Sequence, residues 1–203
     1  MAFESCGIVG AKLHPYSTNS EERARILLGI AALAFALAWV IAALIGTAHV
    51  PFWLDVPATG SLYGILYKIF ERWGWKLSAF HKLNLVSVPN LAGVWRGSIS
   101  SSFDSTDSHS VEVKITQNWT HFCVELSSQN SDSHSIVGSI DTSVGAVLSY
   151  QYENTPKAHA KVTMHAHRGT AVLKLSADGK CLSGEYYSGR DRRNYGSLEF
   201  TRV

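Results

Sequence analysis

Hydrophobic residues follow two different patterns in this chain, divided near Pro89. Before that point they form long runs, and after it they alternate with polar residues. The longest run, residues 26–46, contains no charged residue. As a helix it would span about 30 Å, the thickness of the hydrocarbon core of a bilayer. A signal peptide has an apolar core of only about 7–15 residues, so the run predicts a membrane span.

A second apolar run covers residues 52–70 and is interrupted by Asp55, Pro57 and Lys68. The short segment between the two runs contains no Lys or Arg. Basic residues flank the runs on their outer sides, namely Arg23, Arg25, Arg72, Lys76 and Lys82. Because cytoplasmic flanks carry the excess of Lys and Arg, the pattern predicts a hairpin of two spans with both ends in the cytoplasm. An amphipathic segment lying in the membrane interface is the alternative for the second run.

Alternation with a period of two begins after Pro89 and predicts antiparallel β-strands joined by short turns. The strands are expected at residues 91–100, 111–116, 121–126, 135–142, 144–152, 171–175, 182–189 and 196–202. Residues 162–168 are read as a loop or as a bent extension of the next strand, with Gly169 as the kink. A closed antiparallel barrel needs an even number of strands, so we expect an eight-stranded, lipocalin-like β-barrel. An open sandwich is the alternative.

These patterns divide the 203 residues into three parts. Residues 1–25 form a cytoplasmic polar lead, residues 26–82 form the transmembrane hairpin with a juxtamembrane segment, and residues 89–203 form a cytoplasmic β-barrel. The fold class is therefore mainly β, with a two-helix transmembrane region before the barrel.

Composition removes several classes of function. A net charge of +2 is too small to indicate a DNA or RNA polymer as partner. The three cysteines match neither a disulfide framework nor a zinc spacing, and they fit a reducing compartment. His165 and His167 lack a third metal ligand. With no nucleophile elbow, oriented triad or phosphate loop, we expect a protein that is not an enzyme and uses no cofactor or metal.

The first strand carries Gly93-Val94-Trp95, which resembles the G-x-W motif of lipocalin-type barrels. In those barrels an arginine of the last strand covers the tryptophan at the closed end, a role that Arg202 would fill. The opposite end is then expected to gather arginines and tyrosines: Arg168, Arg190, Arg192, Arg193, Tyr150, Tyr152 and Tyr195. Guanidinium groups bind phosphate and aromatic rings stack on bases, which suits a small anionic ligand that contains rings. The alternative is an exposed basic loop, partly neutralised by Asp191.

Several segments, taken in order, resemble a known family. They are residues 62–73 (LYGILYKIFERW), 88–97 (VPNLAGVWRG), 115–120 (ITQNWT), 164–171 (MHAHRGTA) and 186–196 (YYSGRDRRNYG). With the two apolar runs, they are similar to the two-transmembrane β-barrel effectors of CBASS, the bacterial anti-phage system that signals through cyclic oligonucleotides.

This resemblance implies an effector in the bacterial inner membrane with its barrel in the cytoplasm. The barrel would bind a cyclic dinucleotide made by a cognate nucleotidyltransferase, and the protein would then form homo-oligomers that disrupt the membrane and kill the infected cell. The ligand residues implied by the matching segments are Arg168, Arg190, Arg193 and Tyr195. Tyr150 and Tyr152 are added from the barrel geometry alone. Tyr195 is expected to point outward unless its loop bulges.

Two other functions stay open from the sequence. One is a membrane-tethered, lipocalin-like carrier of an apolar ligand. The other is a structural barrel without a pocket, filled by Trp95, Phe122, Leu173 and Phe200.

Overall fold

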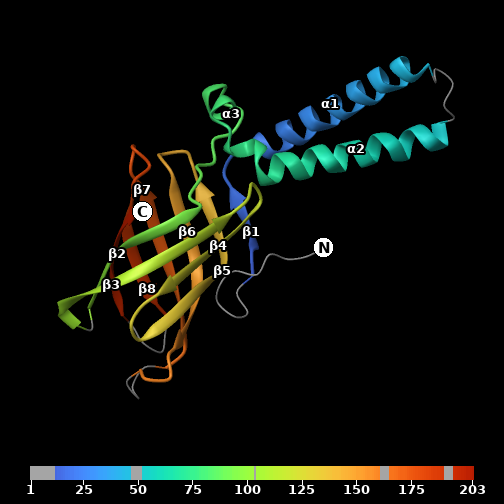
Figure 1. Cartoon of the computed structure of the whole chain (residues 1–203). Coiled ribbons are helices and arrows are strands. Elements are labelled where there is room, and N and C mark those ends of the chain that lie inside the picture. Colours follow the sequence, from blue (N-terminus) through green and yellow to red (C-terminus); the bar gives the residue numbers. More distant parts are fainter. Residues whose placement is uncertain (1–11, 47–51, 103, 161–164, 190–193) are drawn as a thin grey trace. The chain divides into compact units, whose positions relative to one another are not determined.

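The computed structural model describes residues 12–46, 52–102, 104–160, 165–189 and 194–203, and the chain divides into two compact units. One unit is helical and runs from Ser20 to Ser87. The other is a β-barrel that combines the described residues before Ser20 with those from Val88 onward (Figure 1). A segment that precedes the helices therefore belongs to the same unit as the strands that follow them.

The helical unit consists of α1 (Glu22–Ile45), α2 (Phe52–Arg72), the 3-10 turn η1 (Gly74–Lys76) and the short helix α3 (Ser78–Lys82). The first two pack against each other as an antiparallel pair (Figure 1). Helix α1 ends at Gly46, whose φ of 72° is left-handed, and its backbone N–H bonds the carbonyls of Ala42 and Ala43. Glycine adopts this conformation without steric cost, which is why the helix stops there.

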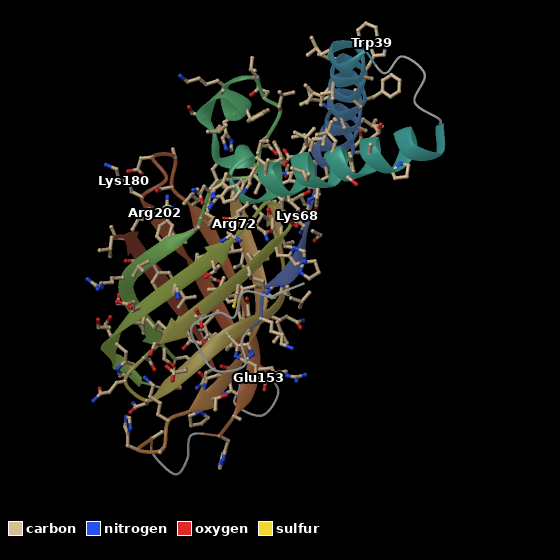
Figure 2. The ribbon with its side chains drawn as sticks, turned by 45° about the vertical axis from the view of Figure 1, so that its right-hand side comes forward. Trp39, Lys68, Arg72, Glu153, Lys180 and Arg202 are labelled. Carbon is tan, nitrogen blue, oxygen red and sulfur yellow. The ribbon has the colours of Figure 1, made fainter. Side chains whose placement is uncertain are left out.

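Most of the apolar surface of α1 is uncovered. Leu28 is 72% exposed and Leu44 81%, whereas Ala34 is 1% exposed. Trp39 likewise projects from the helix (Figure 2). Such exposure suits lipid rather than water. Among the described helices, α1 is the one long and apolar enough to cross a membrane, over Glu22–Leu44. The predicted second span does form helix α2. The mean hydropathy of α2 is too low for the same assignment, so its crossing of the membrane stays a prediction.

Eight strands form a continuous antiparallel series in which each strand pairs with the next one. They are β2 (Gly93–Ser101), β3 (Asp104–Gln117), β4 (His121–Ser127), β5 (Ser131–Asp141), β6 (Val147–Pro156), β7 (His167–Leu175), β8 (Cys181–Ser188) and β9 (Tyr195–Arg202). The last strand pairs with the first, from Trp95 opposite Arg202 to Ser101 opposite Gly196, and this closes the barrel. The predicted closed, mainly β barrel is confirmed.

The predicted count of eight strands, all antiparallel, is wrong. A ninth strand, β1 (His14–Thr18), completes the barrel, so part of the expected polar lead is structured. It pairs antiparallel with β4 through His14 and Pro15, and parallel with β5 through Tyr16–Thr18. A closed barrel with an odd number of strands must contain a parallel pair, and the β1–β5 pair meets this requirement.

Strand β1 occupies a gap that opens between β4 and β5. These two strands pair directly only from Glu125–Ser127 to Asp132–His134, and a bulge between Ser135 and Val137 then turns β5 away. At that branch the Ser135 hydroxyl accepts a hydrogen bond from Val124 N at 2.9 Å and lies 2.7 Å from His14 Nε2. One serine thereby connects all three strands.

One end of the barrel interior is packed with apolar side chains, and we call it the closed end. Trp95, Phe122, Leu148, Leu173, Leu182 and Phe200 are each at most 2% exposed. The Arg202 guanidinium lies 4.9 Å from the centroid of the Trp95 ring and donates to the carbonyls of Asn90 and Ala92. Arg202 and Lys180 mark this end in Figure 2, and Glu153 lies toward the other.

The chain leaves the barrel after β1 and returns to it before β2, both times at the closed end. Thr18, the last residue of β1, pairs with Ile140, and β2 starts at Gly93 beside Arg202. Gln117 holds the segment before β2, because its side chain accepts from Leu91 N at 2.7 Å and donates to the Pro89 carbonyl at 3.2 Å. Both connections to the helical segment therefore leave from this end.

Gly169 is not a kink. It pairs in register with Tyr152 on one side and Ser188 on the other, within a regular β7 that begins at His167. Residues 162–164, the first three of the predicted bent extension, lie outside the described residues. The register shift in this part of the barrel is instead the one on β5.

Candidate ligand-binding cavity

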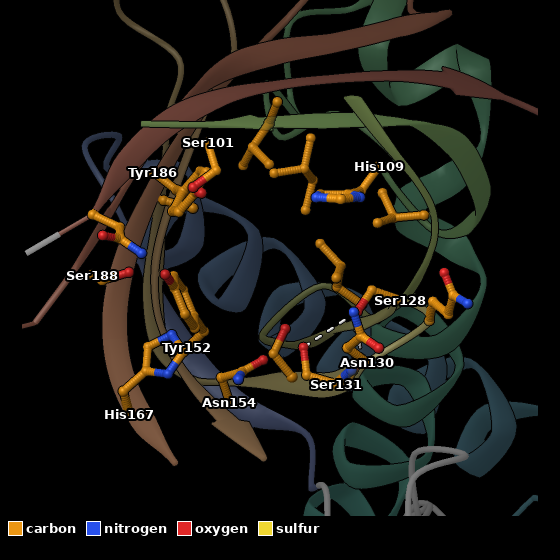
Figure 3. Close-up of a pocket in the computed structure, with 18 of the residues that line it drawn as sticks. Ser101, His109, Ser128, Asn130, Ser131, Tyr152, Asn154, His167, Tyr186 and Ser188 are labelled. Atoms are coloured by element: carbon orange, nitrogen blue, oxygen red, sulfur yellow. Dashed lines mark hydrogen bonds between the residues drawn. The ribbon is translucent and has the colours of Figure 1, made fainter. Parts of the chain in front are cut away.

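A cavity of about 590 Å³ occupies the end of the barrel opposite Trp95, which we call the open end (Figure 3). Volumes of this order are typical of small-molecule sites. Serine, asparagine, histidine and tyrosine side chains provide most of its wall, among them Ser101, His109, Asn130, Tyr152, Asn154 and Tyr186. The alternative of a structural barrel without a pocket is therefore wrong for this half of the interior.

Strand β6 shows how one sheet face becomes a cavity wall. Its inward residues are, in order, Leu148, Tyr150, Tyr152 and Asn154, all at most 9% exposed. Because side chains on a strand alternate between faces, the same face passes from a packed leucine to rings and then to an amide. The chemistry of the interior thus changes along a single strand.

Aromatic rings run along one wall of the cavity. Tyr150 and Tyr152 meet edge to face with ring centroids 6.5 Å apart, and His167 meets Tyr152 in the same way at 6.3 Å. Figure 3 shows Tyr152 and His167 side by side at the cavity. Burial raises the pKa of Tyr150, so its hydroxyl stays protonated at neutral pH and can act as a hydrogen-bond donor.

The position of the Tyr152 ring depends on Gly169. A Cβ at Gly169 would collide with the Tyr152 hydroxyl and with the Tyr187 carbonyl. The cross-strand neighbour of Tyr152 must therefore lack a side chain for the ring to occupy this position. Gly169 is needed for close approach rather than for its conformational freedom.

The rim of the cavity at the β4–β5 turn is fixed by polar contacts. Ser128 donates from its backbone and from its hydroxyl to the Ser131 carbonyl, each at 2.9 Å. Lys157 Nζ lies 2.6 Å from the Ser128 carbonyl and 3.2 Å from a carboxylate oxygen of Asp132. His159 Nε2 lies 2.8 Å from the Gln129 carbonyl. The segment after β6 therefore holds this turn in place.

One polar group in the wall lacks a partner. Asn154 is 6% exposed, and its side-chain nitrogen Nδ2 has no hydrogen-bond acceptor among the described residues. Buried amide donors are almost always paired in folded proteins. This buried donor is thus unsatisfied in the ligand-free barrel.

Two residues expected at the ligand lie outside the cavity. Arg168 is on the outer face of β7, where its Nη2 forms an ion pair with Glu153 at 3.0 Å. Tyr195 is 62% exposed and also points outward, as its alternation with the buried Leu198 indicates. Both positions are out of phase with the inward face by one residue. Ala171 on the same strand points inward, and side chains on a strand alternate between faces. This alternation alone would have placed Arg168 on the outer face.

Arg190 and Arg193 lie outside the described residues, and their predicted role stays a prediction. Ser188, two residues before Arg190, and Asn194, directly after Arg193, both line the cavity. Among the described residues of the lining there is no Asp, Glu, Lys or Arg.

The structure adds wall residues that the sequence reasoning missed. Tyr150 and Tyr152 do line the cavity, and continuing their alternation by two positions would have added Asn154. His109, Ser108 and Ser110 come from the first half of β3, which extends well before the predicted strand at residues 111–116. Those residues carry no hydrophobic alternation, so the pattern gave no signal there.

Two family models match the chain. Residues 86–202 match the model described as "Cap15, cyclic dinucleotide receptor domain", and residues 24–76 match the one described as "Cap15, TM helices". The first match covers the eight strands β2–β9, and the second covers both long helices.

Two curated relatives are similar over most of their length, and both are named CD-NTase-associated protein 15. The protein from Yersinia aleksiciae is 32% identical over 148 residues, which are 72% of this chain and 70% of that protein. The protein from Staphylococcus schleiferi is 26% identical over 141 residues, which are 68% of this chain and 75% of that protein. The predicted resemblance to CBASS effectors is thereby confirmed. A chain with these matches and this barrel belongs to the Cap15 family, which joins transmembrane helices to a cyclic dinucleotide receptor domain.

Proposed function

We propose that this protein is a membrane-embedded effector of CBASS anti-phage defence whose barrel cavity binds a cyclic dinucleotide. Binding then drives homo-oligomerisation, disruption of the inner membrane and death of the infected cell. The observation that carries the proposal is the cavity, which combines tyrosine rings with neutral hydrogen-bond donors inside a receptor-family barrel. We propose that the barrel acts by binding alone, without catalysis, cofactor or metal.

The wall chemistry suits the two parts of such a ligand. Rings such as Tyr150 and Tyr152 offer surfaces for the bases. Serine hydroxyls, asparagine amides and the Tyr150 hydroxyl offer donors to phosphate and sugar oxygens. Arg190 and Arg193 are proposed to add charge at the open end, because they follow the lining residue Ser188 by two positions and directly precede the lining residue Asn194.

The same wall weighs against the alternative carrier of an apolar ligand. Serines from β2 and β5, represented by Ser101 and Ser133, and Asn154 from β6 line the cavity. Burying an apolar molecule against these groups would remove their water without replacing its hydrogen bonds, which costs free energy.

The output is proposed to come from the helical unit. Helix α1 crosses the membrane and α2, with 21 residues, is proposed to return across it, since such a helix is about 30 Å long. Arg23 and Arg25 on one flank and Arg72 on the other are expected to keep both ends in the cytoplasm. A ligand that binds the assembled form more tightly shifts the equilibrium toward assembly by that difference in affinity.

Binding by the full chain tests the proposal. The isolated residues 88–203 are unsuitable because they lack β1. The detergent-solubilised protein is titrated in a calorimeter with cyclic dinucleotides of different bases, with the linear dinucleotides and a fluorescent fatty acid as comparisons. We expect saturable binding of at least one cyclic dinucleotide and an increase in oligomer size. Binding of the fatty acid alone would contradict the proposal and favour the carrier.

A further inference from the structure

The unpaired Nδ2 donor of Asn154 points to a role for this residue in the cavity. We propose that Asn154 reads the edge of one base of the ligand through its side-chain amide. This inference rests on the proposed function, since it names a residue that sets the specificity of the same site.

The ligand-free barrel gives no energetic reason for an asparagine at this position. Asn154 is 6% exposed, and its Nδ2 donor has no acceptor among the described residues. A buried donor that loses water without gaining a partner lowers stability. A leucine, which has the same number and branching of side-chain heavy atoms, would avoid that cost, so the empty cavity gains nothing from an asparagine here. An acceptor supplied by a ligand explains the choice.

The Asn154 amide also has a suitable position in the cavity wall. Asn154 follows Tyr150 and Tyr152 on the inward face of β6 and pairs across the sheet with His167 and Ser133. In Figure 3 it lies next to Tyr152 at the cavity. A base that contacts the tyrosine ring would therefore present its edge near the amide.

Asparagine also differs from most of the lining residues in the type of its side chain. The described lining contains many hydroxyl groups but no charged side chain. A hydroxyl can rotate to serve as donor or acceptor and therefore discriminates weakly among bases. An amide presents one donor beside one acceptor in a fixed plane, which is how asparagine pairs with adenine in nucleic-acid recognition.

Two substitutions in the full-length protein test whether Asn154 reads a base of the ligand. Asn154→Leu removes both hydrogen-bonding groups, and Asn154→Asp replaces the donor by an acceptor. The control is Gln151→Glu, which makes the same amide-to-carboxylate change on the exposed outer face of the same strand. Binding of cyclic di-AMP and cyclic di-GMP is measured by calorimetry at pH 8, well above the usual pKa of an aspartate carboxyl, and melting temperature is measured without ligand.

We expect Asn154→Leu to weaken binding of the better wild-type ligand about tenfold or more, while the ligand-free protein melts no lower than wild type. We expect Asn154→Asp to change the affinity ratio of the two ligands about tenfold in favour of guanine, whose N1–H and N2–H₂ are two adjacent donors for a carboxylate. Gln151→Glu should change neither quantity.

The outcomes separate the two proposals. If the wild type binds neither these nor other cyclic dinucleotides, the proposed function fails. If it binds them but Asn154→Asp weakens both ligands equally, the amide contacts the shared sugar-phosphate ring, and base reading is wrong. Unchanged binding in Asn154→Leu, or melting several degrees lower without ligand, would likewise overturn the inference.

Discussion

The two halves of the barrel interior are made by the same strands and serve different purposes. At the closed end the inward residues of β6 and β7 are Leu148 and Leu173, both at most 2% exposed, and the space is full. At the open end the same two strands provide Tyr152 and His167, which line a cavity of about 590 Å³. A strand of about ten residues is long enough to contribute packed core residues at one end and cavity-lining residues at the other.

The two halves also differ in how they are closed. At the open end β4 and β5 pair directly, whereas at the closed end β1 lies between them. Both connections to the helical segment leave from the closed end. Because the closed end is packed and the open end holds the cavity, we expect substitutions at the closed end to affect folding and substitutions at the open end to affect binding.

The largest effect is expected from Trp95→Ala at the closed end. Trp95 is fully buried, its Nε1 donates to the Leu91 carbonyl at 3.0 Å, and Arg202 lies over its ring. Removing such a ring costs about 3–5 kcal/mol, measured as the free energy of unfolding in urea followed by circular dichroism. Tyr187→Ala on the outer face, 51% exposed, is the matched control. Equal losses in both variants would remove the distinction between a packed interior and an outer face.

A second prediction tests the close approach at the open end. In Gly169→Ala the new Cβ collides with the Tyr152 ring and the Tyr187 carbonyl. Overpacking of this kind costs about 1–3 kcal/mol, and because the ring must move, ligand affinity is expected to fall with it. Thr170→Ala, the next residue on β7, should change neither melting temperature nor affinity. Wild-type behaviour of Gly169→Ala would show that Tyr152 adapts freely and does not define the wall.

A third prediction separates the cavity tyrosine from the outer one. Tyr152→Leu removes a surface for base stacking, which is worth about 1–3 kcal/mol, so affinity for the ligand should fall at least several-fold. Tyr195→Leu, at a residue 62% exposed on the outer face, should keep wild-type affinity. Calorimetry on the two variants decides this. The opposite order would restore Tyr195 to the site and would mean that its segment rearranges around the ligand.

The smallest effect is expected at the β1 seam and depends on pH. Burial is the main cause that lowers the pKa of His14, with His121 and His134 adding repulsion. The folded protein therefore binds fewer protons than the unfolded chain, and this contribution to stability is lost as pH falls below about 6.5. We expect the melting temperature to decrease from pH 7.5 to 5.5 by less in His14→Gln than in wild type. An equal decrease in both proteins would assign the pH dependence to other groups.

Much of the fold could be predicted from alternation, because eight strands carry their own hydrophobic pattern. Strand β1 could not, since His14–Thr18 has a proline and a single buried residue, Tyr16. Its extended form depends on partners more than 100 residues away, such as Phe122 and Gly138. Segment matching placed Arg168 at the site, whereas the alternation that positions Tyr150 and Tyr152 places it outside. A shift of one residue on a strand exchanges the two faces.

Dye release from liposomes tests the central claim most directly. The full-length protein is reconstituted in vesicles filled with a self-quenching dye, and the cyclic dinucleotide that binds best is added. We expect release that depends on ligand concentration, is retained in Tyr195→Leu and is strongly reduced in Tyr152→Leu. If the ligand binds the wild-type protein in these vesicles but releases no dye, capture in the cavity is not coupled to the membrane, and the account is contradicted.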